Sequence, residues 1–346
     1  VNRAQSTRRD RDRLCRASPV SIERCSSDIR EQTSDDPFRM WLRNLCVFLG
    51  TSDFDLTAAR LDEALGDALC PPCGDQTVSV GGFVPPLKGE HAMTHVVDGL
   101  AICCYQTISR VLPGPVVAEE VAERVEAIEA REDRKVSRRE KADLKDEVHF
   151  ELLPRAFTRS KRTTLVVDLR ASRVWVDTSS ENSAEEVIAA LREALGSLPV
   201  KRPEPTIGVA GELSRWVAEA GALPNGFECG DRCLLETTDE TKASLRITAM
   251  DLQQDEICAH LAQGMQATKL NVAVDDALEF DVDENLDLKR IRALDLIQED
   301  LDSVDADDAV AELTARIALQ GEAIRGVLDR LYTHFGVAGE CSSQAA

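Results

Sequence analysis

Helix-like and strand-like periods of hydrophobic positions alternate along this chain without a fixed order. Residues 40–49 (MWLRNLCVFL) alternate in part and carry Trp and Phe, which predicts an opening β-strand. Leu61, Leu65 and Leu69 then recur at four-residue spacing. This spacing predicts an amphipathic helix that follows Asp55 and ends near Leu69.

The middle of the chain contains one long helical stretch. Before it, residues 81–86 (GGFVPP) predict a loop and residues 91–104 a strand. The helical pattern covers residues 118–153. Ser137 and Glu140 stand at the spacing of a capping box, so we expect this stretch to break near residue 137.

A hairpin is expected after the long helical stretch. Pro154 ends the helix, and residues 155–159 predict a loop. Residues 163–169 and 173–178 are β-branched and alternating, which is typical of two paired strands.

The second half mixes shorter elements. Ser183 and Glu186 predict the start of a helix that stops at Gly196. A last long helix is expected over residues 306–334, with Gly336 beyond its end. Between them we expect helices at 211–220 and 252–262, and strands at 244–249, 269–274 and 278–282. Without βαβ regularity, the pattern favours an α+β fold with antiparallel sheets.

Domain boundaries follow from the same pattern. Residues 1–38 are rich in Arg, Ser and Asp, lack an apolar period and are expected to be disordered. The globular pattern begins at Met40, which favours a true start there; a functional basic tail is the alternative. The further lobes expected are an α+β lobe at 39–112, a helical basic arm at 113–162 and an α+β lobe at 163–346.

Composition narrows the class of protein. The 346 residues are 43% hydrophobic and 30% charged, with no apolar run of the roughly 20 residues that span a bilayer. The Arg-rich N-terminus lacks the apolar segment of a secretion signal, so we expect a cytoplasmic protein. Its 11 cysteines are then expected to be reduced.

Charge changes the picture most. The net charge is −21, yet residues 131–173 carry 13 Lys and Arg against 8 Asp and Glu, whereas residues 174–346 carry 14 against 34. If residues 131–151 form one helix, its cations other than Arg139 fall within roughly 120° and its carboxylates lie opposite. That separation favours a stripe facing a polyanion. A solvated helix with intrahelical ion pairs is the alternative.

Other chemistry has weak support. The phosphate-binding motifs GxxxxGK[ST] and GxGxxG are absent from the sequence. Cys70 and Cys73, with Cys229 and Cys233, offer a zinc or thiol site as the rival hypothesis. The two pairs are more than 150 residues apart, and the first closes a helix where a thioredoxin-like motif would open one. No cofactor is expected.

Phe157 stands out in a chain with 4% aromatic residues, because it lies between Arg155 and Arg159 just after a helix stop. Its side chain either folds back onto its own core or serves as an anchor for a partner subunit.

Several segments together resemble the RdgC family of bacterial recombination-associated proteins. In order they are MWLRNLCVF, GGFVPP, THVVDG (94–99), VLPGPVV (111–117), DLKDEVHFELLPRAFTR (143–159), LGSLPV (195–200), TKL (268–270) and DLKRIR (287–292). The resemblance covers residues 40–336, and the segment 143–159 is the most specific.

This resemblance implies a non-enzymatic, ring-shaped homodimer that encircles duplex DNA without sequence preference. It also implies association with the nucleoid and restraint of RecA-dependent homologous recombination. The residues that would line the hole are Arg131, Arg134, Lys135, Arg138, Arg139, Lys141 and Lys145, and Arg155, Arg159, Lys161 and Arg162 extend this basic stretch.

Subunit contacts are also implied. Phe157, with Pro154 beside it, would lock one subunit onto the other. The sequence departs from the family at Ala249 and Met250, where the second ring contact would carry polar or basic residues.

Overall fold

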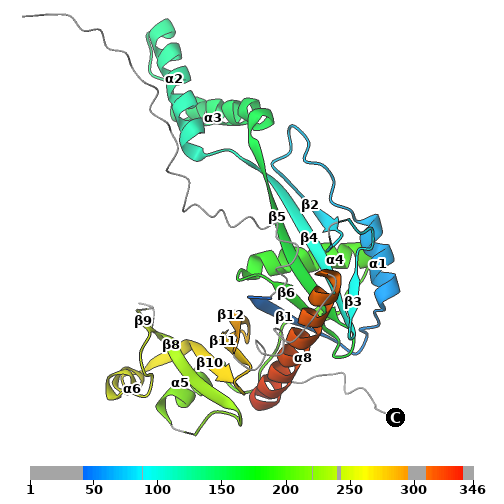
Figure 1. The fold of residues 1–346 in the computed structure, drawn as a ribbon. Coiled ribbons are helices and arrows are strands. Elements are labelled where there is room, and N and C mark those ends of the chain that lie inside the picture. Colours follow the sequence, from blue (N-terminus) through cyan, green and yellow to red (C-terminus); the bar gives the residue numbers. More distant parts are fainter. Residues whose placement is uncertain (1–41, 88, 220, 240–242, 295–308, 338–346) are drawn as a thin grey trace, which may run out of the picture. The chain divides into compact units, whose positions relative to one another are not determined.

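One antiparallel sheet organises the structure (Figure 1), a computed structural model that describes residues 42–87, 89–219, 221–239, 243–294 and 309–337. The predictions for residues 1–38 and for the start at Met40 lie outside the described residues. Every strand pairing in the sheet that these residues show is antiparallel. The predicted α+β class is therefore confirmed.

The sheet has 12 strands in the described part of the chain. From one edge to the other they are β2 (Ser79–Val84), β4 (Leu100–Val111), β5 (Phe157–Asp168), β6 (Arg173–Asp177), β1 (Leu45–Gly50), β12 (Leu288–Ala293), β11 (Leu278–Asp283), β10 (Met265–Val274), β8 (Phe227–Thr237) and β9 (Ser244–Thr248). Two short strands lie off this path: β3 (His95–Val97) pairs with β4, and β7 (Val200–Lys201) pairs with β1.

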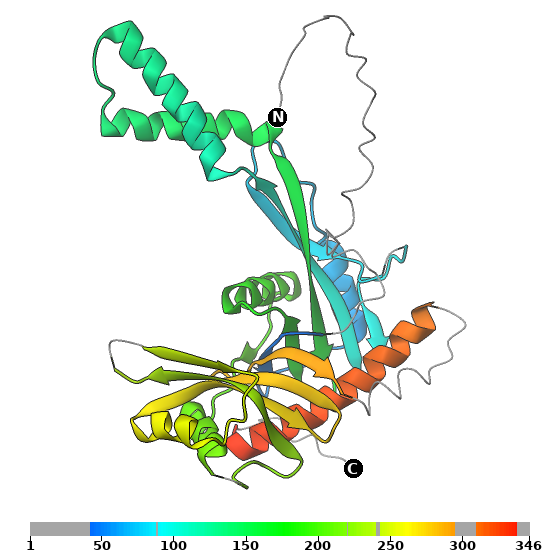
Figure 2. The same ribbon diagram turned by 60° about the vertical axis from the view of Figure 1, so that its left-hand side comes forward.

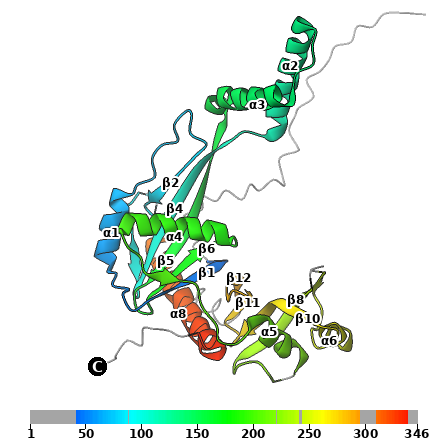
Figure 3. The ribbon, with the colours of Figure 1, turned by 180° about the vertical axis from the view of Figure 1, so that it is seen from behind.

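Helices cover the two faces of the sheet unequally. On one face α1 (Ala58–Asp67) and α4 (Glu181–Leu195) pack on β1, β4, β5 and β6 (Figure 3). The other face is covered by α5 (Val209–Ala218), α6 (Asp255–Ala262) and α8 (Ala309–Phe335). The strands contribute apolar side chains to the core on each face, because successive residues of a strand point to opposite faces.

Two helices lie outside these cores. They are α2 (Gly114–Glu132) and α3 (Arg138–Leu152), followed by the short 3-10 helix η1 (Leu153–Arg155). The long strands β4 and β5 connect this helix pair to the rest of the sheet (Figure 2).

Helix starts differ from the expectations by a few residues. Thr57, two residues after Asp55, caps α1, and its side chain accepts from the N–H of Arg60 at 3.3 Å. The cap of α4 is Ser180 instead of Ser183. Gly196 ends α4 as predicted, with a φ of 74° that favours glycine.

The predicted loop at 81–86 is wrong for residues 81–84, which belong to β2. Glycine fits there because the backbone of Cys70 lies so close to Gly82 that a Cβ would collide with it. Two backbone hydrogen bonds hold these segments together, from Cys70 N to Phe83 O at 2.9 Å and from Phe83 N to Ala68 O at 2.9 Å.

The second half confirms most of the predicted elements. The helices expected at 211–220 and 252–262 are α5 and α6, and the three expected strands are β9, β10 and β11. Sequence reasoning missed β8 and β12. Within the expected last helix, the described part is α8, which ends at Phe335.

Candidate nucleic-acid interface

The helix pair between β4 and β5 is called the arm here and comprises α2, α3 and η1, residues 114–155. The predicted break is confirmed at Ser137. The Ser137 side chain accepts from the N–H of Glu140 at 3.3 Å, and the Glu140 carboxylate accepts from the N–H of Ser137 at 2.8 Å. This capping box starts α3 after a left-handed residue, Asp133, ends α2.

Few side chains hold the arm together. Its buried apolar side chains are Val117, Val125, Val136, Val148 and Leu153. The guanidinium of Arg124 on α2 donates to Glu151 on α3 at 2.6 Å and to Glu120 at 3.0 Å. The two helices therefore share a small apolar seam that is bridged by one arginine.

Because the arm is two helices, a cationic stripe along a single helix from 131 to 151 is wrong. Within α3 the separation of charge persists, since Arg138, Lys141 and Lys145 fall within about 60° at 100° per residue. All three side chains are exposed, as is Arg139 elsewhere on α3. Among the described residues none of these four has a carboxylate within ion-pair distance.

The cations before α3 behave differently. Arg131 binds Glu132 at 2.8 Å, and Arg134 binds Glu132 and Glu140, each at 2.8 Å. Arg134, followed by the hydrogen bonds from Ser137, lowers the pKa of Glu140 to about 2. Arg134 lies between α2 and α3, so its pairs cross the helix break and are not the intrahelical pairs of the alternative. Lys135, next to it, is exposed.

The predicted loop at 155–159 is also wrong from Phe157 onward, because β5 begins there. Alternation in β5 places Phe157, Arg159 and Lys161 on one face, and all three are exposed. Arg162 points to the opposite face. Its guanidinium donates to the carbonyl of Pro85 at 2.5 Å and to the Cys104 sulfur at 3.2 Å, so its donors are partly committed.

Phe157 does not fold back onto a core, because 87% of the residue is exposed. Phe150 and Val111, which is paired with Phe157 across β4 and β5, are exposed as well. An open cleft of about 400 Å³ lies on the arm close by. It is lined by Phe150, Leu152, Pro154 and Arg155, together with Arg124 and Glu120 among others.

Arg110 is a residue that sequence reasoning missed. Its guanidinium donates to the carbonyl oxygens of Leu153, Pro154 and Ala156 at 3.1, 3.2 and 3.2 Å. The side chain is 7% exposed. It therefore fixes the turn that presents Phe157. The one signal for this role in the sequence was the position of an arginine at the end of an apolar strand.

The two cysteine pairs of the rival hypothesis lie on different elements and do not form one site. Cys229 and Cys233 lie on β8, while Cys70 and Cys73 follow α1. Burial raises the pKa of Cys229 to about 11 and that of Cys233 to about 12. Protonated thiols are poor metal ligands and nucleophiles. Among the described residues, no group of three or more His, Cys, Asp or Glu could hold a metal ion.

The helices of the described part also include none that is long and apolar enough to cross a membrane. What this fold and its site define is an α+β protein whose exposed cations gather on a helical arm beside an exposed aromatic residue.

Comparison with known proteins extends this description. A family model described as "Putative exonuclease, RdgC" matches residues 40–338. Proteins named recombination-associated protein RdgC are similar to this chain. That of Pseudomonas aeruginosa is 36% identical over 299 residues, covering 86% of this chain and 97% of its own length. That of Halorhodospira halophila is 34% identical over 297 residues, covering 86% and 98%. The chain belongs to the RdgC family.

Proposed function

We propose that this protein binds duplex DNA without sequence preference, as a homodimer that encircles it, and thereby restrains RecA-dependent recombination. The observation that carries this proposal is the exposed row Arg138, Lys141 and Lys145 on α3, without carboxylate partners among the described residues. Cations that no protein carboxylate neutralises remain available to phosphates.

Sequence-independent binding follows from the same chemistry. Contacts from Arg and Lys to phosphate oxygens carry no base information. Arg139, Lys135, Arg155, Arg159 and Lys161 extend the exposed cationic surface from the arm onto β5. Arg131 and Arg134 contribute less on this proposal, because they already bind carboxylates. Arg162 contributes least, because its guanidinium faces Pro85 and Cys104.

Self-association is proposed through Phe157. An exposed aromatic side chain of this size is typical of an interface anchor. In a two-fold dimer each subunit would supply both the Phe157 side chain and the cleft beside Pro154, because such an interface uses the same surface twice. Phe150 and Leu152 give that cleft an apolar wall, and Arg155 offers a cation to the ring.

The link to recombination comes from the relatives, which are named recombination-associated. A ring that occupies duplex DNA would exclude RecA filaments from it, and retention on chromosomal DNA would place the protein in the cytoplasmic nucleoid. Neither step needs catalysis by this chain, so we propose a non-enzymatic role.

The direct experiment measures affinity for two unrelated duplexes over a range of salt concentrations. If about 6 phosphates are neutralised, log K falls against log salt with a slope near −5. Arg138→Glu with Lys141→Glu should weaken binding to both duplexes alike. A salt-insensitive affinity, or a loss confined to one sequence, would contradict the proposal.

Phe157→Ala tests the dimer. Loss of the anchor should raise the dimer dissociation constant, measured by sedimentation, and speed escape from circular DNA. Val96→Ala is the matched control, since Val96 is an exposed apolar residue of β3. Equal dissociation constants for both variants would remove Phe157 from the interface.

The family description also names an exonuclease, and a cleavage assay decides this point. The purified protein is incubated with end-labelled linear duplex and Mg²⁺ or Mn²⁺. We expect the DNA to stay intact. A DNA-shortening activity that co-purifies with the protein would make it an enzyme.

A further inference from the structure

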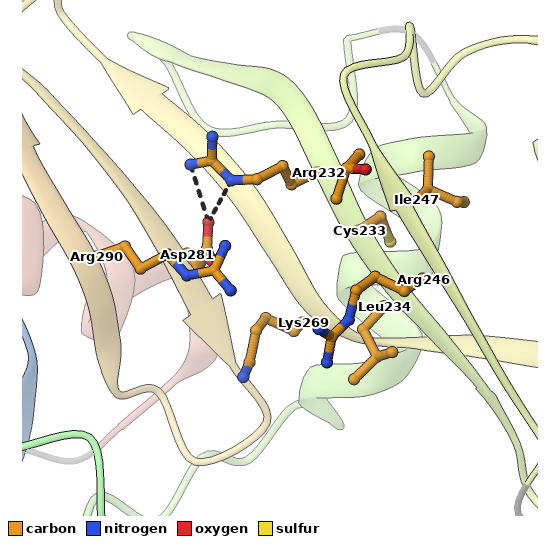
Figure 4. A pocket seen from close by; sticks show the side chains of 9 residues that line it. Arg232, Cys233, Leu234, Arg246, Ile247, Lys269, Asp281 and Arg290 are labelled. Atoms are coloured by element: carbon orange, nitrogen blue, oxygen red, sulfur yellow. Dashed lines mark hydrogen bonds and ion pairs between the residues drawn. The ribbon is translucent and has the colours of Figure 1, made fainter. Parts of the chain in front are cut away.

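A second group of cations lies on the sheet, far along the chain from the arm. The basic pocket is defined by Arg232 on β8, Arg246 on β9, Lys269 on β10 and Arg290 on β12, with Asp281 on β11. Figure 4 shows the charged ends of these side chains around one opening. The pocket has a volume of about 50 Å³.

Strand register explains why these residues meet. Leu234 is paired with Arg246 on one side and with Lys269 on the other, so the two cations share a face. The neighbouring Cys233 and Leu270 point into the core under α5, α6 and α8. The basic pocket therefore lies on the face of β8 to β12 that those helices leave uncovered.

Two irregularities shape the pocket. The pairing of β8 with β10 shifts between Ala267 and Lys269, so the register is irregular next to the lysine. In β12, Arg290 has a φ of 54°, a conformation uncommon for a residue with a side chain. Such strained positions gather at functional sites.

Part of the charge is internally compensated. Arg232 donates to Asp281 at 3.2 and 3.3 Å and to Glu279 at 2.5 Å, which holds its guanidinium in place. Arg290 reaches the second oxygen of Asp281 at 3.4 Å. Among the residues that the structure describes, Arg246 and Lys269 have no acidic partner. An oxyanion between them would relieve their mutual repulsion.

The dimensions limit the ligand. Pockets for whole small molecules measure about 300–1,000 Å³, so the basic pocket has room for a phosphate group while the sugars and bases attached to it stay outside.

We propose that Arg246 and Lys269, held open by the Arg232–Asp281–Arg290 group, bind a backbone phosphate of DNA as a second contact surface separate from the arm. The choice of DNA as the ligand rests on the proposed function. The affinity for a phosphate group follows from the side chains of the basic pocket and does not depend on that function.

The test neutralises the two cations together, as Arg246→Gln with Lys269→Gln. Arg60→Gln with Lys201→Gln is the matched control, because both of its cations are on the surface and on other elements. The slope of log K against log salt should become shallower by about 0.9 in the pocket variant, because the two cations together neutralise one phosphate. The control should keep the slope of the unmodified protein.

The outcomes separate the two proposals. Equal slopes for the unmodified protein and the pocket variant overturn the basic pocket as a DNA contact and leave the proposed function in place. If the unmodified protein does not bind DNA, the proposed function fails and DNA is excluded as the ligand of the basic pocket.

Inorganic phosphate then tests the pocket itself, against chloride at equal ionic strength. A rise in melting temperature that the pocket variant loses supports a site for free phosphate. An equal response of both proteins rejects the site.

Discussion

The core of the body, meaning the described residues outside the arm, and helix α3 of the arm use arginine in opposite ways. In the body, Arg325 binds Asp168 at 2.8 Å and Arg202 binds Asp287 at 2.7 Å, and both carboxylates are buried. On α3, Arg138 and Arg139 face solvent without a carboxylate partner in the described part of the chain. The comparison teaches that a buried carboxylate commits an arginine to the fold, whereas the unneutralised cations of α3 stay available for the binding that we propose.

The largest expected effect concerns a body pair. Asp168→Ala leaves the buried guanidinium of Arg325 without its main partner, which should lower the free energy of unfolding by about 3–5 kcal/mol. Urea unfolding followed by fluorescence of the buried Trp175 measures it. Arg170→Gln, which removes an exposed pair with Asp98, should cost less than about 1 kcal/mol. Similar losses in both variants would break the comparison.

A second body cluster predicts acid sensitivity. Arg215, then hydrogen bonds from His334 and Trp216, lower the pKa of Glu212 to about 2 despite its burial. A lowered folded-state pKa gives stability that is present above about pH 4.5 and lost as the pH falls toward 2, on the order of 3 kcal/mol. Urea unfolding at each pH should show that Glu212→Gln flattens this part of the curve. An unchanged curve would rule out this role of Glu212.

On the arm side, Arg110→Met removes a guanidinium that donates to the carbonyl groups of Gly74, Leu153, Pro154 and Ala156, at a cost of about 1–3 kcal/mol. The effect should stay local, as faster hydrogen exchange of the amides near Phe157 and a raised dimer dissociation constant. Arg60→Met, on α1, is the control. If the arm turn keeps its protection in the Arg110 variant, Arg110 does not position Phe157.

The smallest effect is expected at the helix break. Ser137→Ala removes the cap of α3 and should destabilise its first turn by about 1 kcal/mol. Hydrogen exchange should rise at Glu140 and Lys141 while β4 and β5 stay protected. Ser179→Ala, at an exposed serine outside any helix, should change neither region.

Local patterns predicted the elements whose signals are local. The capping pair of Ser137 and Glu140 announced the break in the arm, and the alternation of 163–169 and 173–178 announced β5 and β6. The strand β8 was missed because Gly230 and Asp231 interrupt its alternation, and its pairing with β10 supplies the order that the segment lacks.

The candidate site was predictable only in part. Clustering of cations in the sequence drew attention to the arm, yet it gave no sign that Arg131 and Arg134 would bind carboxylates. The basic pocket was invisible, because Arg232 and Asp281 are 49 residues apart and meet only through strand pairing. Contacts at such separations depend on topology, which periodicity does not contain.

Crosslinking from α3 tests the central claim most directly. A benzophenone side chain replaces Ala142, an exposed residue between Lys141 and Lys145, so that all cations stay in place. The same group at Ala122 on α2, exposed but outside the row, is the control. Illumination with duplex DNA should crosslink position 142 strongly and in a salt-dependent manner. Equal or absent crosslinking at 142 and 122 would contradict the account.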